Sequence, residues 1–360
     1  EKITSVEEAI YYIQEGGHFD VSLQVSIPNE WENIATCNIG YTAGMETTKV
    51  AWEWIEKGNP MDSIVVVSNH SKQIYEQTVY EGTPPNSEEV HKYSLTTPIT
   101  AVNYPVKKYD NLEPLGLELD FDYNFLCIAQ FGPRKNIMNT VKWFVEEFHD
   151  EEVGLVIKGN FAKNCTMDRD HVFNTLVHPL NSEHPDRKCK IYLLHGDLTD
   201  EEMHSLYIDP KIKGLLSLTH GEGFGLPLFE AAYSGMPVIA TGWSGQLDFL
   251  CDEDRKENFY NVAFDLGPVP EQVLWESVII KESMWAYPRE NSAKEMMRLC
   301  YNDHSEGSGF ASSACEYAEK LHERFEENKM YAQFIDALNL DTSEFDVENW
   351  ISSLEIEEIE

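Results

Sequence analysis

The sequence predicts an α/β protein of two domains, each built on a parallel sheet with helices on both faces. Segments with the composition of strands alternate with amphipathic helical segments along most of the chain. The strand segment SIVVV, residues 63–67, is apolar throughout, as expected of a strand buried on both faces. The alternation stops at the polar, proline-containing residues 107–120 and then begins again. A chain of 360 residues also has the usual length of two domains.

In the first domain, residues 1–106, we expect an acceptor-side sheet that is incomplete at its start. A doubly wound domain usually has more strands than this segment holds, so we expect the opening strand upstream of Glu1. The expected strands are residues 20–27, 37–44, 62–68 and 98–106, and the expected helices are residues 5–16, 47–58 and 70–80.

After a linker at residues 107–120, we expect a complete Rossmann-like domain over residues 121–310. A long helix at Ser312–Leu338 should follow and cross back to the first domain, and the acidic last twenty residues are interpreted as a solvated tail. Strands are expected at residues 123–130, 153–159, 190–196, 214–220 and 236–241, with helices at 136–148, near 168–178, at 200–207 and from 226.

Charge and composition exclude several classes of protein. A formal net charge of −36 is unsuited to binding nucleic acid or anionic lipid. No apolar run has the length of a membrane span, and no signal peptide opens the chain, so we expect a cytoplasmic protein. The seven cysteines are scattered without a C-x-x-C pair, which predicts reduced thiols, no disulfide framework and no metal site.

The informative stretch is THGEGFGLPLFEAAYSGMPVIATGWSG, residues 219–245. A glycine-rich turn after a parallel strand lets a ligand approach the backbone, and the helix start near Leu226 offers free N–H groups and a positive dipole end to phosphate. Glu222 lies in the turn and Glu230 lies one helical turn inside the helix. Because carboxylates accept hydrogen bonds from hydroxyls, this pattern predicts a site for a nucleotide sugar.

The segment E-G-F-G-L-P-L-F-E-A resembles the signature of retaining family-4 glycosyltransferases. The segments IAQFGPRKN, LVIKGN and YLLHGDLTDEEMHSLY resemble further parts of that family in the same order, over about residues 125–249. SIPNEW, NIGYTAGMETT and NPMDSIVVVSNHSK weakly resemble a bacterial and phage branch. The resemblance implies the GT-B fold, in which two Rossmann-like domains face each other across a cleft.

The resemblance also implies residue roles. Lys135 would contact the donor diphosphate, while Gln130 stands where the family has an arginine, so Arg134 is the candidate for the missing charge. Many members of the family have a catalytic-side histidine just after the strand that corresponds to residues 38–44, and this chain has Met45-Glu46-Thr47 there. Glu46 is therefore a candidate polar group near the anomeric carbon, or alternatively a helix N-terminal acid. Glu222 would bind sugar hydroxyls and Glu230 the ribose. The donor would further contact the backbone of Gly223, Phe224, Gly225 and Leu226, the base would meet Leu194 and His195, and Ser244 and Gly245 would meet phosphate.

We therefore expect an enzyme that moves a hexose from a UDP- or GDP-linked donor to a hydroxyl, with retention of anomeric configuration and without metal or cofactor. The acceptor would be a glycan, a lipid-linked sugar or a protein. Two alternatives stay open: another enzyme on the same fold, such as a nucleotide-sugar epimerase or a sugar phosphorylase, and a non-catalytic nucleotide-binding module. His70 is interpreted either as a residue facing the interdomain cleft or as a simple helix-start residue.

Overall fold

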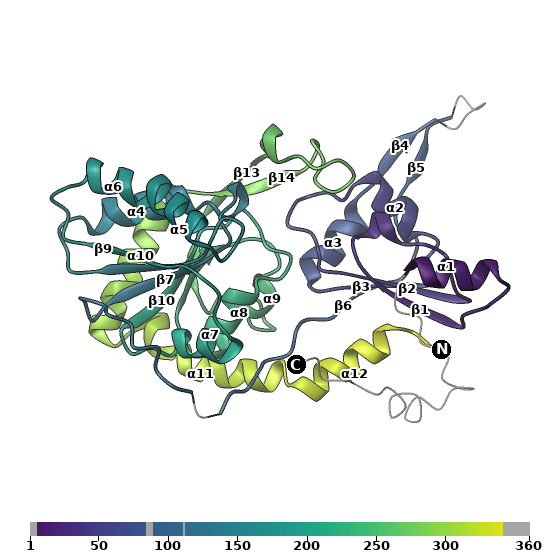
Figure 1. Cartoon of the computed structure of the whole chain (residues 1–360). Helices are drawn as coiled ribbons and strands as arrows, with labels where there is room; N and C mark the ends of the chain where they lie inside the picture. The colour runs from purple at the N-terminus through teal and green to yellow at the C-terminus, as the bar shows by residue number, and fades with distance from the viewer. Residues whose placement is uncertain (1–5, 84–88, 111, 341–360) are drawn as a thin grey trace.

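The structure, a computed structural model, describes residues 6–83, 89–110 and 112–340. Two parallel sheets form two domains that lie side by side, and a pair of C-terminal helices runs beneath both of them (Figure 1). The acidic tail at residues 341–360 lies outside the described residues.

The first sheet has the strand order β1-β2-β3-β6, and all of its pairs are parallel. Its central strand β3 is buried at every position, as its apolar sequence predicts. Trp31, Trp54 and Tyr75 are the large aromatic residues of the core beside it. The elements are α1 (Val6–Gln14), β1 (Val21–Val25), η1 (Pro28–Glu30), β2 (Cys37–Thr42), α2 (Trp52–Gly58), β3 (Ser63–Val66), α3 (Asn69–Gln77), the hairpin β4 (Tyr80–Gly82) and β5 (His91–Tyr93), and β6 (Ile99–Ala101).

The expected helix at residues 47–58 begins only at Trp52, and the expected helix at 70–80 ends at Gln77. The polar groups of the preceding loop have partners outside a helix: Thr48 Oγ1 accepts a hydrogen bond from Met284 N at 2.9 Å. Val50 N donates to Thr78 Oγ1 at 3.3 Å. Tertiary partners thus replace the intrahelical hydrogen bonds that the sequence pattern suggests.

The second sheet has the strand order β12-β11-β10-β7-β8-β9, again entirely parallel. Successive residues of its central strand enter opposite cores: Phe125 packs with Phe144 on one face, and Leu126 packs with Phe229 on the other. Its strands are β7 (Asn124–Ile128), β8 (Gly154–Lys158), β9 (Lys190–Leu194), β10 (Ile212–Ser217), β11 (Val238–Thr241) and β12 (Tyr260–Val262).

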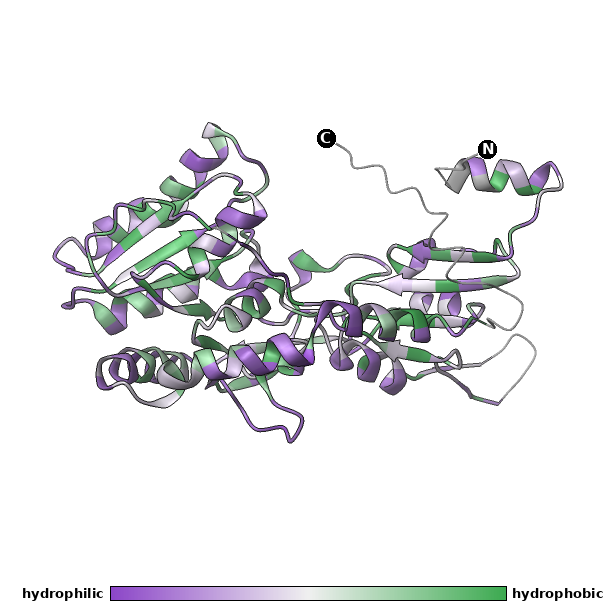
Figure 2. Cartoon of the chain, turned by 90° about the horizontal axis from the view of Figure 1, so that it is seen from below, coloured by the Kyte–Doolittle hydropathy of each residue, from purple (hydrophilic) through white to green (hydrophobic). Residues whose placement is uncertain are grey.

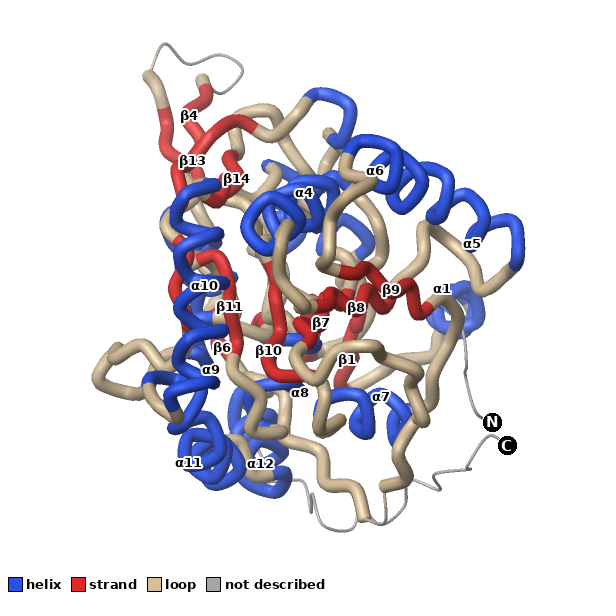
Figure 3. The backbone as a smooth tube through the Cα atoms, turned by 90° about the vertical axis from the view of Figure 1, so that its left-hand side faces the viewer, coloured by secondary structure: helices blue, strands red, loops and turns tan. Residues whose placement is uncertain are grey.

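Helices cover both faces of this sheet, with α4 to α6 on one side and α7 and α8 on the other (Figure 3). The most apolar residues lie along the strands between them (Figure 2). A π-helical turn, Phe173–Val177, interrupts the helix expected near 168–178. The helical elements are η2 (Pro133–Lys135), α4 (Ile137–Phe148), α5 (Thr166–Val172), α6 (His178–Glu183), α7 (Asp200–Tyr207), α8 (Leu226–Tyr233), α9 (Leu247–Leu250), η4 (Glu271–Val273) and α10 (Glu290–Glu306).

The predicted single helix at Ser312–Leu338 is wrong, because two helices occupy this stretch: α11 (Gly309–Arg324) and α12 (Glu327–Ala337). The chain bends at Phe325, whose ring is 1% exposed in the core of the second domain. The Glu326 carboxylate accepts a hydrogen bond from Lys329 N and so starts the second helix. The Phe325 ring is buried and its carbonyl accepts a hydrogen bond from Val106 N at 2.9 Å, so tertiary contacts hold the chain where the helix breaks.

After the break, α12 runs beneath the first sheet (Figure 1). Leu338, at the end of this helix, packs with Ile39 and Val65 of that sheet, and its carbonyl accepts a hydrogen bond from Ser63 Oγ at 3.2 Å. Phe334 makes an edge contact with Tyr41. The C-terminal helix thus ties the end of the described chain to the first domain.

The sequence pattern did not indicate the antiparallel pair β13 (Phe264–Pro268) and β14 (Met284–Pro288). Residues 269–283 between these strands, called the excursion below, reach the first domain. Val278 lies in the core that contains Trp54, and Ser277 Oγ donates to Glu53 Oε1 at 2.8 Å. The excursion is therefore a second connection between the two domains.

Candidate nucleotide-sugar site

The candidate site lies at the topological switch point of the second sheet. From the central strand β7 the chain continues outward through β8 and β9, and then returns to β10 on the opposite side of β7. Parallel sheets bind ligands at the carboxyl ends of the strands at such a point. The turns that follow β7 and β10 carry Arg134, Lys135 and Glu222, so the fold brings together side chains that are 87 residues apart in sequence.

The turn after β10 presents its backbone to the site. Gly225 precedes α8 with φ of +99°, a conformation that favours glycine, and Pro227 follows inside the first turn of the helix. Leu228 N and Phe229 N both donate to Gly225 O. Within the described part of the chain, the N–H groups of residues 223–226 have no hydrogen-bond acceptor. This row of donors at a helix start suits an anion such as phosphate.

Glu222 is buried and binds both cations of the β7 turn. Lys135 Nζ lies 2.6 Å from Glu222 Oε1, and Arg134 Nη1 lies 3.0 Å from Glu222 Oε2. Burial by itself would raise the pKa of this carboxyl, but the charges of Arg134 and Lys135 outweigh burial and hold the pKa below its usual value. Glu222 is therefore an ionised acceptor in a site shielded from water.

Glu46 joins this cluster from the first domain. Arg134 Nε lies 3.0 Å from Glu46 Oε1, so one guanidinium bridges the carboxylates of both domains. Burial tends to lower the pKa of Arg134, and Glu222 and Glu46 raise it above its usual value. Because α2 begins only at Trp52, Glu46 is not a helix N-terminal acid, and this alternative from the sequence is wrong.

The glycines of the GEGFG turn also let the domains approach each other. A Cβ atom on Gly223 would lie 2.6 Å from Ala43 O, and one on Gly221 would lie 2.5 Å from Glu46 O. Neither distance is possible without moving one of the two backbones. The sequence pattern suggested room for a ligand at these glycines, and the structure adds a close contact with loop 43–46.

Ser244 and Gly245 form hydrogen bonds with the backbone of Glu222 in the turn after β10. Glu222 N donates to Ser244 Oγ at 2.8 Å, and Gly245 N donates to Glu222 O at 3.0 Å. Ser244 has φ of +78°, unusual for a residue other than glycine, and its hydroxyl donates to the buried Gln246. Gln246, which the sequence analysis did not single out, anchors this arrangement through Thr241 O at 3.0 Å. These contacts give Ser244 and Gly245 a positioning role at Glu222.

Glu230 lies one helical turn into α8 and is bound by Tyr207, whose hydroxyl donates to Oε2 at 2.7 Å. Burial raises the pKa of Glu230, although the Tyr207 hydrogen bond and the charge of Lys107 act in the opposite direction. Tyr207 was not among the predicted site residues, since nothing in a single sequence pairs residues on two separate helices. The remaining carboxylate oxygen of Glu230 is an acceptor suited to a hydroxyl.

At the edge of the second sheet, Leu194 is the last residue of β9 and His195 follows it. His195 Nε2 lies 2.9 Å from Asp168 Oδ1, and both side chains are buried. Asp168 also accepts hydrogen bonds from the backbone N–H groups of residues 161–163. Burial tends to raise the pKa of Asp168, but His195 and these three N–H groups hold it well below its usual value. Asp168, which the sequence analysis missed, thus fixes the loops expected to meet the base.

Gln130, at the position of the family arginine, does not join the cluster. Its Nε2 donates to Phe161 O at 3.1 Å, in the neighbouring loop. His70 lies in the contact between the domains, edge-on to Trp243 with 4.8 Å between ring centroids. Burial lowers the pKa of His70 to about 4, so this imidazole is neutral at pH 7. His70 is the second residue of α3 and also lies in the domain junction, so the structure agrees with both of its interpretations from sequence.

Asp248, also missed by the sequence analysis, forms a further contact between the domains. Its Oδ2 accepts hydrogen bonds from Asn69 N at 2.7 Å and from Asn103 Nδ2 at 2.9 Å. Burial raises the pKa of this carboxyl, and the Asn69 and Asn103 hydrogen bonds lower it in part. Among the described residues, no group of three or more His, Cys, Asp or Glu side chains is arranged to hold a metal ion.

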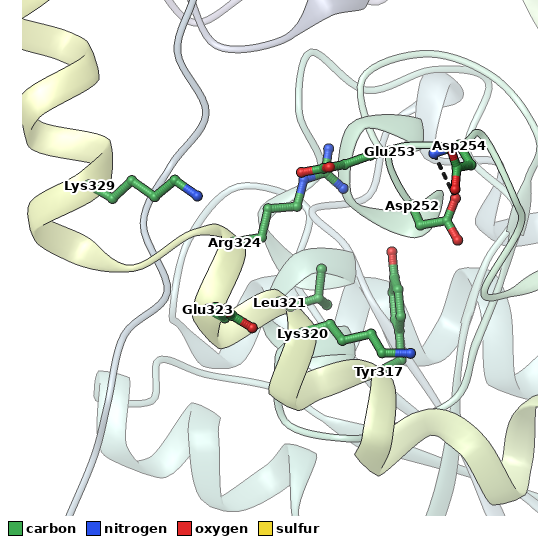
Figure 4. A pocket seen from close by; sticks show the side chains of 9 residues that line it. All are labelled: Asp252, Glu253, Asp254, Tyr317, Lys320, Leu321, Glu323, Arg324 and Lys329. Atoms are coloured by element: carbon green, nitrogen blue, oxygen red, sulfur yellow. Dashed lines mark hydrogen bonds between the residues drawn. The ribbon is translucent and has the colours of Figure 1, made fainter.

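A cavity of about 400 Å³ lies away from this cluster, between the turn at Asp252–Asp254 and helices α11 and α12 (Figure 4). Lys320, Glu323 and Arg324 line it from α11, and the acids Asp252–Asp254 line the opposite side (Figure 4). Arg324 Nη1 donates to Cys251 O at 3.0 Å. The lining mixes four carboxylates with three cationic side chains, so it does not select an anion or a cation.

Comparison with known proteins bears on the fold and on the class of protein. Residues 118–261 match the family model of glycosyl transferases group 1, a span of less than half the chain that includes the second sheet and the turns of the site. About 92% of the chain superposes on TarM, with a TM-score of 0.55, 15% identity and 58% of that chain covered. The trehalose-6-phosphate synthase OtsA gives a TM-score of 0.60 at 9% identity, covering 92% of this chain and 75% of that one. The fold is GT-B.

In sequence, the chain is 30% identical over 131 residues to the serotype-specific mannosyltransferase WbdA of Escherichia coli. The alignment covers 36% of this chain and 15% of WbdA, so the chain spans a small part of the curated relative that it matches. Together with the family match, this supports a glycosyltransferase. No helix among the described residues is long and apolar enough to cross a membrane.

Proposed function

We propose that the protein is a retaining glycosyltransferase that moves a hexose from a UDP- or GDP-linked donor to an acceptor hydroxyl. The observation that carries the proposal is the arrangement at the switch point. There, two cations, a row of free backbone N–H groups and a buried carboxylate converge within one hydrogen-bonded cluster. The match of residues 118–261 to glycosyl transferases group 1 supports it independently. The similarity to WbdA makes mannose the first sugar to test.

Charge balance suggests how the donor enters. Without a ligand, Arg134 and Lys135 are balanced by Glu46 and Glu222. A diphosphate would compete for both cations and also accept hydrogen bonds from the N–H groups of residues 223–226. Glu222 would then be released from Lys135 and could accept hydrogen bonds from sugar hydroxyls. The diphosphate would then share Arg134 and Lys135 with Glu46 and Glu222, and the backbone N–H groups of residues 223–226 would compensate part of the added negative charge.

The same cations would stabilise the leaving group. As the bond from the anomeric carbon to the diphosphate breaks, negative charge grows on the diphosphate oxygen, close to Lys135 and the start of α8. Glu230 would hold the ribose hydroxyls, and the loops fixed by Asp168 would meet the base. Glu46, held beside Arg134, would bring an acid of the first domain to this chemistry. We infer that catalysis is electrostatic and needs no metal.

The proposal is tested by thermal shift with UDP, GDP, UDP-glucose and GDP-mannose on the wild type and on Glu230→Ala. A ligand present at a hundred times its Kd stabilises the native state by about 2.7 kcal/mol. We expect one nucleotide series to raise the Tm of the wild type and to lose its effect in the variant. Glu319→Ala, which removes an exposed acid on α11, is the matched control and should keep the full shift. A wild type that responds to none of these ligands contradicts the donor site.

Once a donor is identified, the anomeric configuration of the product decides retention. Proton NMR of the product formed on an oligosaccharide acceptor should give the same configuration as the donor. An inverted product would contradict this part of the proposal. Conversion of the donor sugar without any acceptor would instead favour an epimerase.

A further inference from the structure

A second cavity, of about 420 Å³, lies where the excursion meets the first domain. Trp52, Glu53 and Tyr80 line it from the first domain, and Glu276, Ile280 and Glu282 line it from the excursion. We propose that this cavity is an acceptor subsite that binds one neutral sugar unit of an oligosaccharide, apart from the unit that receives the transferred sugar. The proposal rests on the glycosyltransferase function proposed above.

An aromatic ring of fixed orientation faces the cavity. Trp52, at the first position of α2, is 36% exposed. Its ring packs edge-on with Tyr80 and Tyr93, with centroid distances of 5.6 Å and 5.3 Å. Tyr80 is itself held by Val50 O, to which its hydroxyl donates at 2.6 Å. Because these contacts fix the indole before a ligand arrives, packing the C–H face of a sugar against it costs little side-chain entropy.

Carboxylates with unused acceptor capacity lie around this ring. Glu276 and Glu282 form no hydrogen bond or ion pair with any residue that the structure describes, and Glu53 accepts a single one from Ser277. Ionised carboxylates only accept hydrogen bonds, so their natural partners here are the hydroxyls of a sugar. An aromatic ring for the C–H face and acceptors for the hydroxyls match the two surfaces that a sugar ring offers.

The charge of the lining selects a neutral sugar. Among the described residues that line the cavity, three carboxylates face one ammonium group, that of Lys281, which is already paired with Glu271 at 3.6 Å. A second ammonium group, that of Lys49, lies over the Tyr80 ring at 4.0 Å from its centroid, so the carboxylates still outnumber the cations. A phosphorylated or otherwise anionic acceptor unit would meet uncompensated negative charge and would be repelled.

The cavity lies within reach of the candidate site. Trp52 follows Glu46 by six residues, and six residues span at most about 22 Å even when fully extended. Thr48, between these two residues, holds the start of β14 through its hydrogen bond with Met284 N. One segment of the first domain thus connects Glu46 at the site with Trp52 in the cavity, and an acceptor a few sugars long could contact both.

The test is isothermal titration of the intact protein with mannose and with α-linked manno-oligosaccharides of increasing length, without any nucleotide. We expect the affinity to rise at the oligosaccharide length that first reaches the cavity. Trp52→Ala should weaken binding of that longer oligosaccharide about tenfold, which corresponds to about 1.4 kcal/mol, and leave the affinity for mannose unchanged. Trp52→Tyr keeps a ring and should retain most of the affinity. Glu276→Gln combined with Glu282→Gln should weaken neutral oligosaccharides and improve binding of a terminally phosphorylated one.

Trp275→Ala is the matched control, because Trp275 is an exposed tryptophan on the same excursion that does not line the cavity. Equal affinity of wild type and Trp52→Ala for every oligosaccharide would overturn the subsite, as would an equal loss in Trp275→Ala. No detectable binding of the series to the wild type would overturn it as well. Because the titration contains no nucleotide, its failure is distinct from a failure of the donor site, which the thermal shift reports.

Discussion

Arg134 connects the two domains at the candidate site, and replacing it by alanine should destabilise the protein. Breaking a buried ion pair costs about 3–5 kcal/mol, because it leaves the other charge unpaired and away from water. We expect about 2 kcal/mol here, for two reasons. The Arg134 side chain is 28% exposed, and Glu222 keeps Lys135 as a partner at 2.6 Å.

The two carboxylates that Arg134 binds should differ in coupling energy. The Glu222 side chain is 8% exposed and that of Glu46 is 22% exposed, while both lie 3.0 Å from the guanidinium. Water screens the Glu46 pair more strongly, so we expect coupling of about 2 kcal/mol to Glu222 and about 0.5–1 kcal/mol to Glu46. The assay is urea unfolding, followed by circular dichroism, of Arg134→Ala, Glu222→Gln, Glu46→Gln and the two double variants.

The sign of the pH dependence gives a second readout. The pKa of Glu222 is lower in the folded protein than in the unfolded chain, where it is about 4.3. The stabilisation from this group is therefore complete above about pH 4.3 and is lost as the pH falls through the folded pKa. The difference in unfolding free energy between wild type and Glu222→Gln should therefore decrease as the pH falls below about 4.3.

Arg169→Ala is the control, since Arg169 forms an exposed ion pair with Asp170 at 3.2 Å. It should change stability by less than about 0.5 kcal/mol. An Arg134→Ala variant that is no less stable than this control would contradict the expected contribution of the two ion pairs. So would a coupling to Glu46 that equals or exceeds the coupling to Glu222.

Three further predictions concern the junction of the domains. Gly223→Ala places a Cβ 2.6 Å from Ala43 O, so it should lower the free energy of unfolding by about 1–3 kcal/mol and weaken nucleotide binding. An unchanged Tm would mean that loop 43–46 can move aside without a cost in stability. Burial lowers the pKa of His70 to about 4, so the unfolded chain takes up this proton first and stability should fall as the pH drops below about 6.5. His70→Asn should flatten the stability curve between those values, and an unaltered curve would exclude His70 as its cause. Leu338→Ala removes a side chain that is 7% exposed against the first sheet and should cost about 2 kcal/mol in urea unfolding, whereas Ile335→Ala, 40% exposed on the same helix, should cost little; similar losses would contradict the packing.

The sequence predicted those parts of the fold that local patterns encode. The apolar run in β3 and the alternation around β7 to β11 gave both parallel sheets, because a strand buried on two faces must be apolar at successive positions. The predicted helix boundaries were less accurate where residues distant in sequence form hydrogen bonds with the backbone. The late start of α2 at Trp52 and the break at Phe325 are both of this kind.

The candidate site was predicted in part. Glu222, Lys135 and Arg134 stand in recognisable local segments, and the structure brings them into one cluster. Asp168 and Asp248 were missed, because each is one of many acids in a chain with a net charge of −36 and neither lies in a recognisable motif. Only their hydrogen bonds in the folded chain distinguish them from surface acids.

The sequence was sufficient to predict the class of fold, the restart of the strand–helix alternation near residue 121 and the glycine-rich turn at residues 221–225. These features depend on residues close together in the chain, so local periodicity and glycine placement encode them. The tertiary structure alone decided that Arg134 joins Glu46 to Glu222 across the domains and that the excursion meets α2. Such contacts depend on how two separately encoded surfaces pack, and no short segment of sequence contains both of them.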